Sequence, residues 1–304
     1  MQSDRLGSSD RMNSSSLIAV LNAASRRVGL RSDGAEVIRL GENALYRLPN
    51  GVVARIARTG QDAAAAKEIN VATWLEDNGV AAVRPRRDVE QPVVALGHAV
   101  TFWHELPPHQ QGTTADVAAV LRDFHSLPAP KFDLPELSPF VRLADRINEA
   151  RALSPDDRAW MRQRLSELEG AYADLPKGMP RRAIHGDAWR GNVALTADGP
   201  VLHDFERCAF GPPEWDLVST AVGYVTTQMI DAEKWRAYCK TYGYDVTDWD
   251  GFEVLRNIRE LRMTTMAAQV ASTNPTVQPQ LAHRLACLRG EHGTRPWPGW
   301  HPVP

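Results

Sequence analysis

The stretch HGDAWRGN, His185 to Asn192, places an acid and an amide five residues apart in a loop rich in glycine. Asp187 follows Gly186, and Asn192 follows Gly191. An aspartate in such a turn is common, because its side chain hydrogen bonds readily to nearby backbone. The pair at this spacing is also typical of a phosphoryl-transfer loop, in which one side chain handles a hydroxyl proton and the other holds a metal ion. The neighbouring sequence has to decide between these two interpretations.

A short hairpin is predicted directly after this loop. Asn192 is followed by VAL, the turn TADG and the run PVLHDF, which places Asp198 and Gly199 at the turn. Because a hairpin returns the chain to its start, we expect Asp204 to lie near Asn192. Amide and carboxylate oxygens that converge there would suit Mg²⁺. Asp187, at the mouth of the same loop, is then expected to accept a proton from an incoming hydroxyl.

Strand signals dominate the first third of the chain. The runs 44–48 (ALYRL) and 52–57 (VVARIA) flank Asn50-Gly51, which is a strong hairpin signal. Two further strands are expected at PVVAL and AVTFWHEL, with helices over 16–28 and 62–79.

Helical patterns take over after Pro107-Pro108. They extend over six segments: 113–128, 154–175, 214–225, 231–242, 252–271 and 278–290. The tail TRPWPGWHPVP is too rich in proline for a helix or a central strand. We therefore predict an α+β protein with a flexible leader over 1–16, a β-rich part over 17–106 and a helical part over 107–304.

Composition restricts the class of protein. The 304 residues carry a net charge of −2, which argues against a binder of duplex nucleic acid. Three widely spaced cysteines suggest a reducing compartment rather than a disulfide framework. We find no apolar run long enough for a membrane span and no apolar core of a signal peptide, so the expected location is the cytoplasm and no membrane partner is expected. The P-loop and nucleophile-elbow motifs are also absent.

Several segments, in order along the chain, resemble the aminoglycoside phosphotransferase and choline kinase family, which has a protein-kinase-like fold of two lobes. The segments that carry the resemblance are GENALYRL, VVARIAR, AAAKEINVATWL, FWHEL, LRDFHSLP, HGDAWRGN, HDFE and GPPEWDL. Together they extend from Gly41 to Leu217. The combination of HGD-x4-N with the later D-F-E and GPPEWDL is specific, whereas no single piece would be.

The resemblance implies roles for the residues of the predicted loop and hairpin. Asp187 would be the catalytic base or the group that orients the hydroxyl, and Asn192 and Asp204 would be Mg²⁺ ligands. Asp216 would brace the loop. Independently of the resemblance, we expect His185 to hold the loop by hydrogen bonding rather than to act as a base.

The resemblance also implies a nucleotide site in the β-rich part. Arg55 stands where protein kinases have the ATP-binding lysine, and Glu68 matches the helix carboxylate that steadies this cation. Asn43 is expected at the tip of the phosphate-covering loop, and Glu105 at the hinge that meets the adenine. Arginine keeps the positive charge but has a different reach from lysine.

The implied activity is an ATP- and Mg²⁺-dependent phosphotransferase, with GTP not excluded as donor. The acceptor would be a hydroxyl of an aminoglycoside, an amino sugar or a related natural product. Trp189 and Glu260 are candidate acceptor contacts, although the default for the charged run Arg256, Arg259 and Glu260 is a solvated helix face. Two alternatives stay open: a kinase-like enzyme that phosphorylates Ser or Thr of a peptide, with a partner protein, and a nucleotide-binding pseudokinase.

Overall fold

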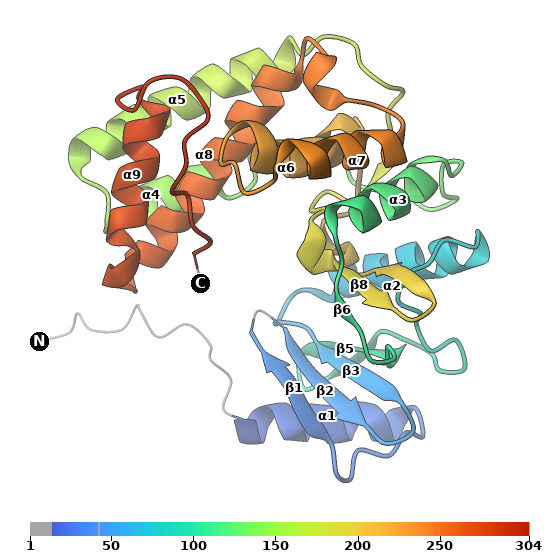
Figure 1. The fold of residues 1–304 in the computed structure, drawn as a ribbon. Coiled ribbons are helices and arrows are strands. Elements are labelled where there is room, and N and C mark those ends of the chain that lie inside the picture. The colour runs from blue at the N-terminus through green and yellow to red at the C-terminus, as the bar shows by residue number, and fades with distance from the viewer. Residues whose placement is uncertain (1–13, 42, 304) are drawn as a thin grey trace, which may run out of the picture. The chain divides into compact units, whose positions relative to one another are not determined.

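The computed structural model describes residues 14–41 and 43–303, which form two compact units (Figure 1). The N-terminal unit comprises the chain through Gln110 together with Thr196–Glu206. The C-terminal unit comprises Gln111–Leu195 and the chain from Arg207 onward. Most of the predicted leader, 1–16, lies outside the described residues, and its last three residues belong to the first helix.

An antiparallel sheet of five strands forms the centre of the N-terminal unit. Its order is β1-β2-β3-β5-β4. Tyr46 of β2 pairs with Ala54 of β3 across the predicted hairpin, and both residues of the Asn50-Gly51 turn have positive φ, 65° and 67°. The strand bounds are β1 Glu36–Leu40, β2 Ala44–Leu48, β3 Val52–Ile56, β4 Val93–Ala95 and β5 His98–His104.

Helices α1 (Ser14–Arg27) and α2 (Asp62–Asp77) belong to the same unit. The apolar face of α1, which includes Leu17 and Leu21, packs on the sheet (Figure 1) and shares one core cluster with β2, β3, β4 and β5. Helix α2 follows the strand that carries Arg55, and it buries Glu68 among its apolar residues. The helix thus brings an acidic side chain to the edge of the core.

The strand β9 (Gly199–Leu202) anchors the second segment of the N-terminal unit. Leu202 donates from its N to the carbonyl of Ala81 at 3.0 Å and accepts from the N of Val83 at 2.9 Å. The predicted turn before it is present, with the Thr196 hydroxyl donating to the Gly199 carbonyl at 2.9 Å. The boundary between the two units crosses the flanking strands β6 (Gln110–Gln111) and β8 (Val193–Thr196).

The C-terminal unit is mainly helical. Helix α8 is its longest helix and packs against α4, α5, α6 and α9 (Figure 1). Strands β7 (Arg182–Ile184) and β10 (Ala209–Gly211) form a small antiparallel pair. The helices are α3 Thr114–His125, α4 Leu143–Glu149, α5 Pro155–Ala173, α6 Glu214–Val225, α7 Ala232–Tyr242, α8 Phe252–Ala271 and α9 Gln278–Leu288. Single 3₁₀ turns occur at η1 Arg190–Asn192, η2 Phe205–Arg207, η3 Val246–Asp248 and η4 Pro275–Val277.

The proline-rich tail has neither helix nor strand through residue 303, as its composition predicts. Its Trp297 and Trp300 are nevertheless buried, in a cluster with Cys287 of α9. All three cysteines are free thiols. Among the described residues, no helix combines the length and the apolar character that a membrane crossing requires. The predicted α+β architecture, with an antiparallel sheet first and helices after it, is confirmed.

Candidate active site

The HGDAWRGN loop leaves strand β7 and ends in the 3₁₀ turn η1. Gly186 has a φ of +81°, and a Cβ at this position would collide with the carbonyl oxygen of Arg207. Only glycine accepts both conditions without strain. The loop therefore passes close to the backbone at Arg207, and Asp187 is placed immediately after this contact.

The carboxylate of Asp216, on α6, holds the loop by hydrogen bonds to the backbone of the loop. One carboxylate oxygen accepts from the N of His185 at 2.7 Å, and the other accepts from the N of Gly186 at 2.8 Å. The Nε2 of His125, on α3, lies 3.1 Å from Oδ2 of the same carboxylate. Burial by itself raises the pKa of the fully buried Asp216. The hydrogen bond and charge of His125, together with smaller contributions from His185, outweigh this effect and bring the pKa below its ordinary value. An ionised acid thus supports the loop. Hydrogen bonds to a carboxylate favour its charged form even when it is buried.

The amide of Asn192 closes the loop from its other end. Its Nδ2 donates to the carbonyl of Asp187 at 2.9 Å, while its backbone N donates to the carbonyl of Trp189 at 2.9 Å. Its Oδ1 accepts no hydrogen bond from any residue between 14 and 303 that the structure describes, which leaves an amide oxygen available as a ligand. His185 is fully buried, and its Nδ1 faces the N of Asp187 at 3.3 Å.

Two tryptophans lie around the loop. Trp189 is 52% exposed, and its ring lies against Gly191, where a Cβ would collide with it. Trp215 is buried and donates from Nε1 to the carbonyl of Gly186 at 3.0 Å. Trp189 is thus presented to solvent beside Asp187, whereas Trp215 belongs to the support of the loop.

A cation faces Asp187 directly. The Nη1 of Arg259, on α8, lies 3.8 Å from the Asp187 carboxylate. The Arg259 side chain is only 11% exposed, whereas that of Asp187 is 40% exposed. Burial lowers the pKa of Arg259, and the charges of Asp187 and Asp216 oppose that effect. Arg259 is therefore an inward-facing residue of the site rather than part of a solvated helix face.

In the N-terminal unit, Arg55 and Glu68 form an ion pair. With its amide oxygen turned toward the guanidinium, Asn43 accepts from Arg55 Nη2 at 2.6 Å and from Nε at 3.2 Å. Arg55 also reaches a carboxylate oxygen of Glu206 at 3.4 Å. The three residues predicted at the nucleotide phosphates, Asn43, Arg55 and Glu68, are thus in direct contact.

Glu68 belongs to a cluster of three carboxylates. One carboxylate oxygen from each of Glu68, Asp204 and Glu206 lies within 4.8 Å of the other two. Burial raises the pKa of Glu68 to about 7, Arg55 works against the rise, and the charges of Asp204 and Glu206 add to it. Asp204 has a positive φ of 68°, an uncommon backbone conformation that aspartate tolerates better than most residues. Acids that repel one another are held together here by the fold.

Glu105 directly follows strand β5, and both its carboxylate and its backbone N form hydrogen bonds. Its carboxylate accepts from Arg47 Nε at 2.5 Å, and its N donates to the carbonyl of Gly51 at 2.8 Å. The predicted nucleotide contact of Glu105 stays a prediction.

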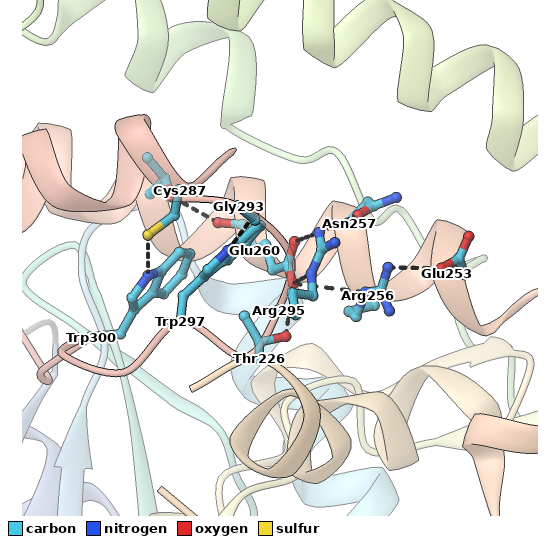
Figure 2. A network of polar contacts seen from close by, with 11 residues as sticks. Thr226, Glu253, Arg256, Asn257, Glu260, Cys287, Gly293, Arg295, Trp297 and Trp300 are labelled. Carbon is cyan, nitrogen blue, oxygen red and sulfur yellow. Dashed lines mark hydrogen bonds and ion pairs between the residues drawn. The ribbon is translucent and has the colours of Figure 1, made fainter. Parts of the chain in front are cut away.

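Glu260, the predicted acceptor contact on α8, is fully buried and surrounded by donors (Figure 2). Arg295 from the tail donates to it through Nε at 2.7 Å and through Nη2 at 2.5 Å, and the Thr226 hydroxyl donates at 2.7 Å. Arg295 also stacks over Trp297, with its guanidinium carbon 4.2 Å from the ring centroid. The side chain of Glu260 is thus occupied by the protein's own cation.

The structure joins the predicted residues into two groups. Asn43, Arg55, Glu68 and Asp204 share the N-terminal unit, whereas His185, Asp187, Trp189, Asn192 and Asp216 share the C-terminal unit. The convergence of Asn192 with Asp204 stays a prediction. Two residues received no role from the sequence: Glu206, although it ends the HDFE motif, and Arg259, although it lies on the charged helix face. Only the fold shows that Glu206 lies beside Arg55 and that Arg259 faces Asp187.

Comparison with known proteins identifies the family. The model of the phosphotransferase enzyme family matches residues 37–254, more than two thirds of the chain. A probable ketoamine kinase from Vibrio vulnificus is 51% identical over 37 residues, a segment that covers 12% of this chain and 12% of that protein.

Three solved structures resemble the whole chain. A choline/ethanolamine kinase family protein from Mesorhizobium loti has a TM-score of 0.64 at 18% identity, covering 92% of this chain and 95% of that chain. An amicoumacin kinase in complex with AMP-PNP, Ca²⁺ and Ami has a TM-score of 0.66 at 14% identity, covering 90% and 92%. A spectinomycin phosphotransferase in complex with ADP and spectinomycin has a TM-score of 0.62 at 13% identity, covering 92% and 94%.

At these identities the structures show the fold, and the family model shows the family. The resemblance predicted from the sequence motifs is confirmed by both. The chain belongs to the phosphotransferase enzyme family and has a protein-kinase-like fold, with an antiparallel-sheet N-lobe and a helical C-lobe.

Proposed function

We propose that this protein is an ATP- and Mg²⁺-dependent phosphotransferase that moves a phosphoryl group to a hydroxyl of a small molecule. The observation that carries the proposal is the gathering of Glu68, Asp204 and Glu206 beside Arg55. Arg55 and Lys67 are the two cations that act on Glu68, so the three carboxylates still outnumber the positive charges around them and favour a bound cation. Oxygen ligands of this kind suit Mg²⁺.

In this proposal the residues of the N-terminal unit bind the nucleotide. Arg55 contacts the phosphates, and Glu68 and Asn43 hold the guanidinium in position. Asp204 is the main carboxylate ligand, with Glu206 next to it and Asn192 contributing its amide oxygen. A bound Mg²⁺ would neutralise phosphate charge, and the remaining task of the protein is to position the reactants.

Asp187 acts on the acceptor. Its carboxylate is 40% exposed, so an incoming hydroxyl can reach it, while Asp216 holds the backbone on which it stands. The Nη1 of Arg259 lies 3.8 Å from the carboxylate and faces it. Asp187 then orients the hydroxyl and takes its proton as the oxygen attacks phosphorus. The choline/ethanolamine kinase family protein and the spectinomycin phosphotransferase of this fold, and the probable ketoamine kinase that matches 37 residues, support a small-molecule acceptor.

Calorimetric titration with Mg²⁺-ATP and Mg²⁺-GTP tests the two halves of the proposal separately. Asp204→Asn is expected to weaken Mg²⁺-dependent nucleotide binding, because a divalent cation loses an anionic ligand. Asp187→Asn is expected to leave that binding nearly unchanged. It should lower turnover by roughly a hundredfold or more, measured as ADP release in a screen of hydroxylated small molecules and Ser/Thr peptides.

Asp198→Asn is the matched control, because Asp198 is an exposed aspartate of the neighbouring hairpin turn. It should behave as wild type in both measurements. If Asp187→Asn turned over an acceptor at the wild-type rate, the HGDAWRGN loop would have a structural role only. If nucleotide bound but neither sugars nor peptides were phosphorylated, the pseudokinase alternative would gain support.

A further inference from the structure

The surroundings of Asp187 in the C-terminal unit are rich in arginine. Arg259 and Arg262 are three residues apart on α8, so their side chains project from the same side of the helix. Both guanidinium groups lie over the ring of Trp215, with their central carbons 5.2 Å and 5.8 Å from its centroid. Trp215 in turn holds the carbonyl of Gly186, so the two arginines are fixed beside the residue that precedes Asp187.

Two more arginines come from other elements. The carbonyl oxygen of Arg207 approaches Gly186 so closely that no side chain fits there. Arg146 of α4 acts electrostatically on Arg262 together with Arg207 and Arg259. Burial, followed by these three like charges, lowers the pKa of Arg262 to about 9, and Asp187 opposes the shift only weakly. Arg262 therefore experiences the charges of Arg207 and Arg259, and the acid that acts on it is Asp187.

The charge of Arg262 in particular is met by a neutral acceptor rather than by a carboxylate. Arg262 donates to the carbonyl of Pro139 at 2.6 Å, which is a neutral acceptor. Within residues 14–41 and 43–303, neither Arg207 nor Arg262 forms an ion pair with a carboxylate. Arg295 shows the opposite case in the same unit, because Glu260 and Asn257 satisfy its donors. Half-buried guanidinium groups without carboxylate partners are costly unless a ligand supplies the missing charge.

We propose that the acceptor of this phosphotransferase carries an oxyanion, a carboxylate or a phosphate, which Arg259 and Arg262 bind while Asp187 addresses its hydroxyl. The proposal rests on the proposed function and names the substrate class of that site. A guanidinium matches the planar fork of carboxylate and phosphate oxygens and binds them bidentately. A polycationic acceptor, which the aminoglycoside comparison would suggest, would instead be repelled by the same arginines.

The first experiment uses inorganic phosphate as the probe, with the full-length protein and a saturating concentration of Mg²⁺-AMP-PNP to occupy the nucleotide site. Calorimetry should detect phosphate binding to wild type. Arg262→Gln, which keeps size and some hydrogen bonding but removes the charge, should weaken it by on the order of tenfold to a hundredfold. Arg262→Lys should retain part of the affinity, because it restores the charge without the fork.

Arg289→Gln is the control. Arg289 also stacks on a tryptophan, Trp160 at 5.2 Å, and pairs with Asp157 at 2.8 Å, but it is outside the arginine group. It should bind phosphate as wild type does. Absence of phosphate binding to wild type, or equal binding to Arg262→Gln, would overturn the proposal. Weakened Mg²⁺-AMP-PNP binding in Arg262→Gln would also overturn it, by assigning the arginines to the nucleotide.

The second experiment separates the two oxyanion sources with four sugars of one scaffold. Glucuronate, glucose 6-phosphate, glucose and glucosamine present a carboxylate, a phosphate, a neutral group and a cation. One of the first two should bind at least tenfold more tightly than glucose, and glucosamine should bind most weakly. Preference for glucosamine would overturn the proposal. Failure of Mg²⁺-ATP binding, by contrast, would reject the proposed function and is measured independently.

Discussion

Two buried glutamates stand in opposite electrostatic surroundings. Glu260 of the C-terminal unit is fully buried, and Arg295 and Thr226 donate three hydrogen bonds to it. Glu68 of the N-terminal unit is 4% exposed and has Arg55 as its cation, but it shares its surroundings with two further acids. Its pKa rises to about 7, chiefly through burial.

The difference separates a structural ion pair from a site prepared for a ligand. At Glu260 the protein provides every partner, so the charge needs nothing from outside. At Glu68 the fold keeps three carboxylates together, and they outnumber the nearby cations Arg55 and Lys67, an arrangement that a bound cation would relieve. Strongly perturbed acids of this kind are concentrated at functional sites, although ion-pair networks also produce them.

The largest expected effect is that of removing Arg295. Arg295→Ala removes the main partner of the buried Glu260 and leaves Arg256, whose Nε lies 3.8 Å away, as the remaining cation. The free energy of unfolding should fall by about 3–5 kcal/mol. Urea unfolding followed by tryptophan fluorescence measures it. Arg289→Ala is the control, because its ion pair with Asp157 is partly exposed and should be worth about 1 kcal/mol or less. A loss for Arg295→Ala as small as that of the control would contradict the structural assignment of Glu260.

The next largest effect is expected when each of the two glutamates, Glu260 and Glu68, is replaced by glutamine. Glu260→Gln weakens three hydrogen bonds that now end on a charge, and should cost about 2–3 kcal/mol. Glu68→Gln removes a charge that burial and two neighbouring acids already disfavour, so stability should remain within about 1 kcal/mol of wild type. The comparison fails if both variants lose stability equally. Mg²⁺-ATP titrations of the two proteins should show weakened binding for Glu68→Gln only.

A smaller effect is expected at Arg55. Arg55→Ala should reduce affinity for Mg²⁺-ATP by about tenfold or somewhat more, the loss of one charged phosphate contact. The strand should remain folded, because Val52 and Ile56 stay in the core. Arg86→Ala, which removes an ion pair with Asp88 at the surface, is the control and should not change the affinity. Unchanged binding by Arg55→Ala would transfer the phosphate role to another residue.

The smallest effect sharpens the description of Glu260. Thr226→Val keeps the shape of the side chain but removes the hydroxyl that donates to Glu260 at 2.7 Å. With Arg295 still in place, the unfolding free energy should fall by about 1 kcal/mol. A double-mutant cycle with Arg295→Ala would measure the coupling between the two donors, and additivity would show that they act independently.

Much of the local structure follows from short sequence patterns. The Asn50-Gly51 hairpin and the Asp198-Gly199 turn lie where turn residues predict them, and so do the helices predicted after Pro108. These features depend on backbone preferences within a few residues. The loop of Asp187 was likewise visible in the motif, in which Gly186 has the positive φ that favours glycine. The close approach of the Arg207 carbonyl to Gly186 is a tertiary contact that the motif does not show. The short helix α4 (Leu143–Glu149) was not predicted.

The charged face of α8 shows where such reasoning ends. Helical spacing groups Arg256, Arg259 and Glu260 and favours a solvated surface. In the fold, Glu260 accepts hydrogen bonds from Arg295 of the tail and from Thr226, which directly follows α6. Arg259, by contrast, faces Asp187. Spacing along one helix defines neighbours on that helix, but not which other element covers it.

The sequence by itself determined the class of protein, the loop with Asp187 and Asn192, and the residues that share each hairpin, because these depend on local backbone chemistry. Tertiary structure alone decided which charges are matched. Arg295 is 35 residues from Glu260, and Glu206 is 151 residues from Arg55. The free-energy cost of burying a charge depends on all the elements that pack around it. A local sequence pattern does not show which elements these are.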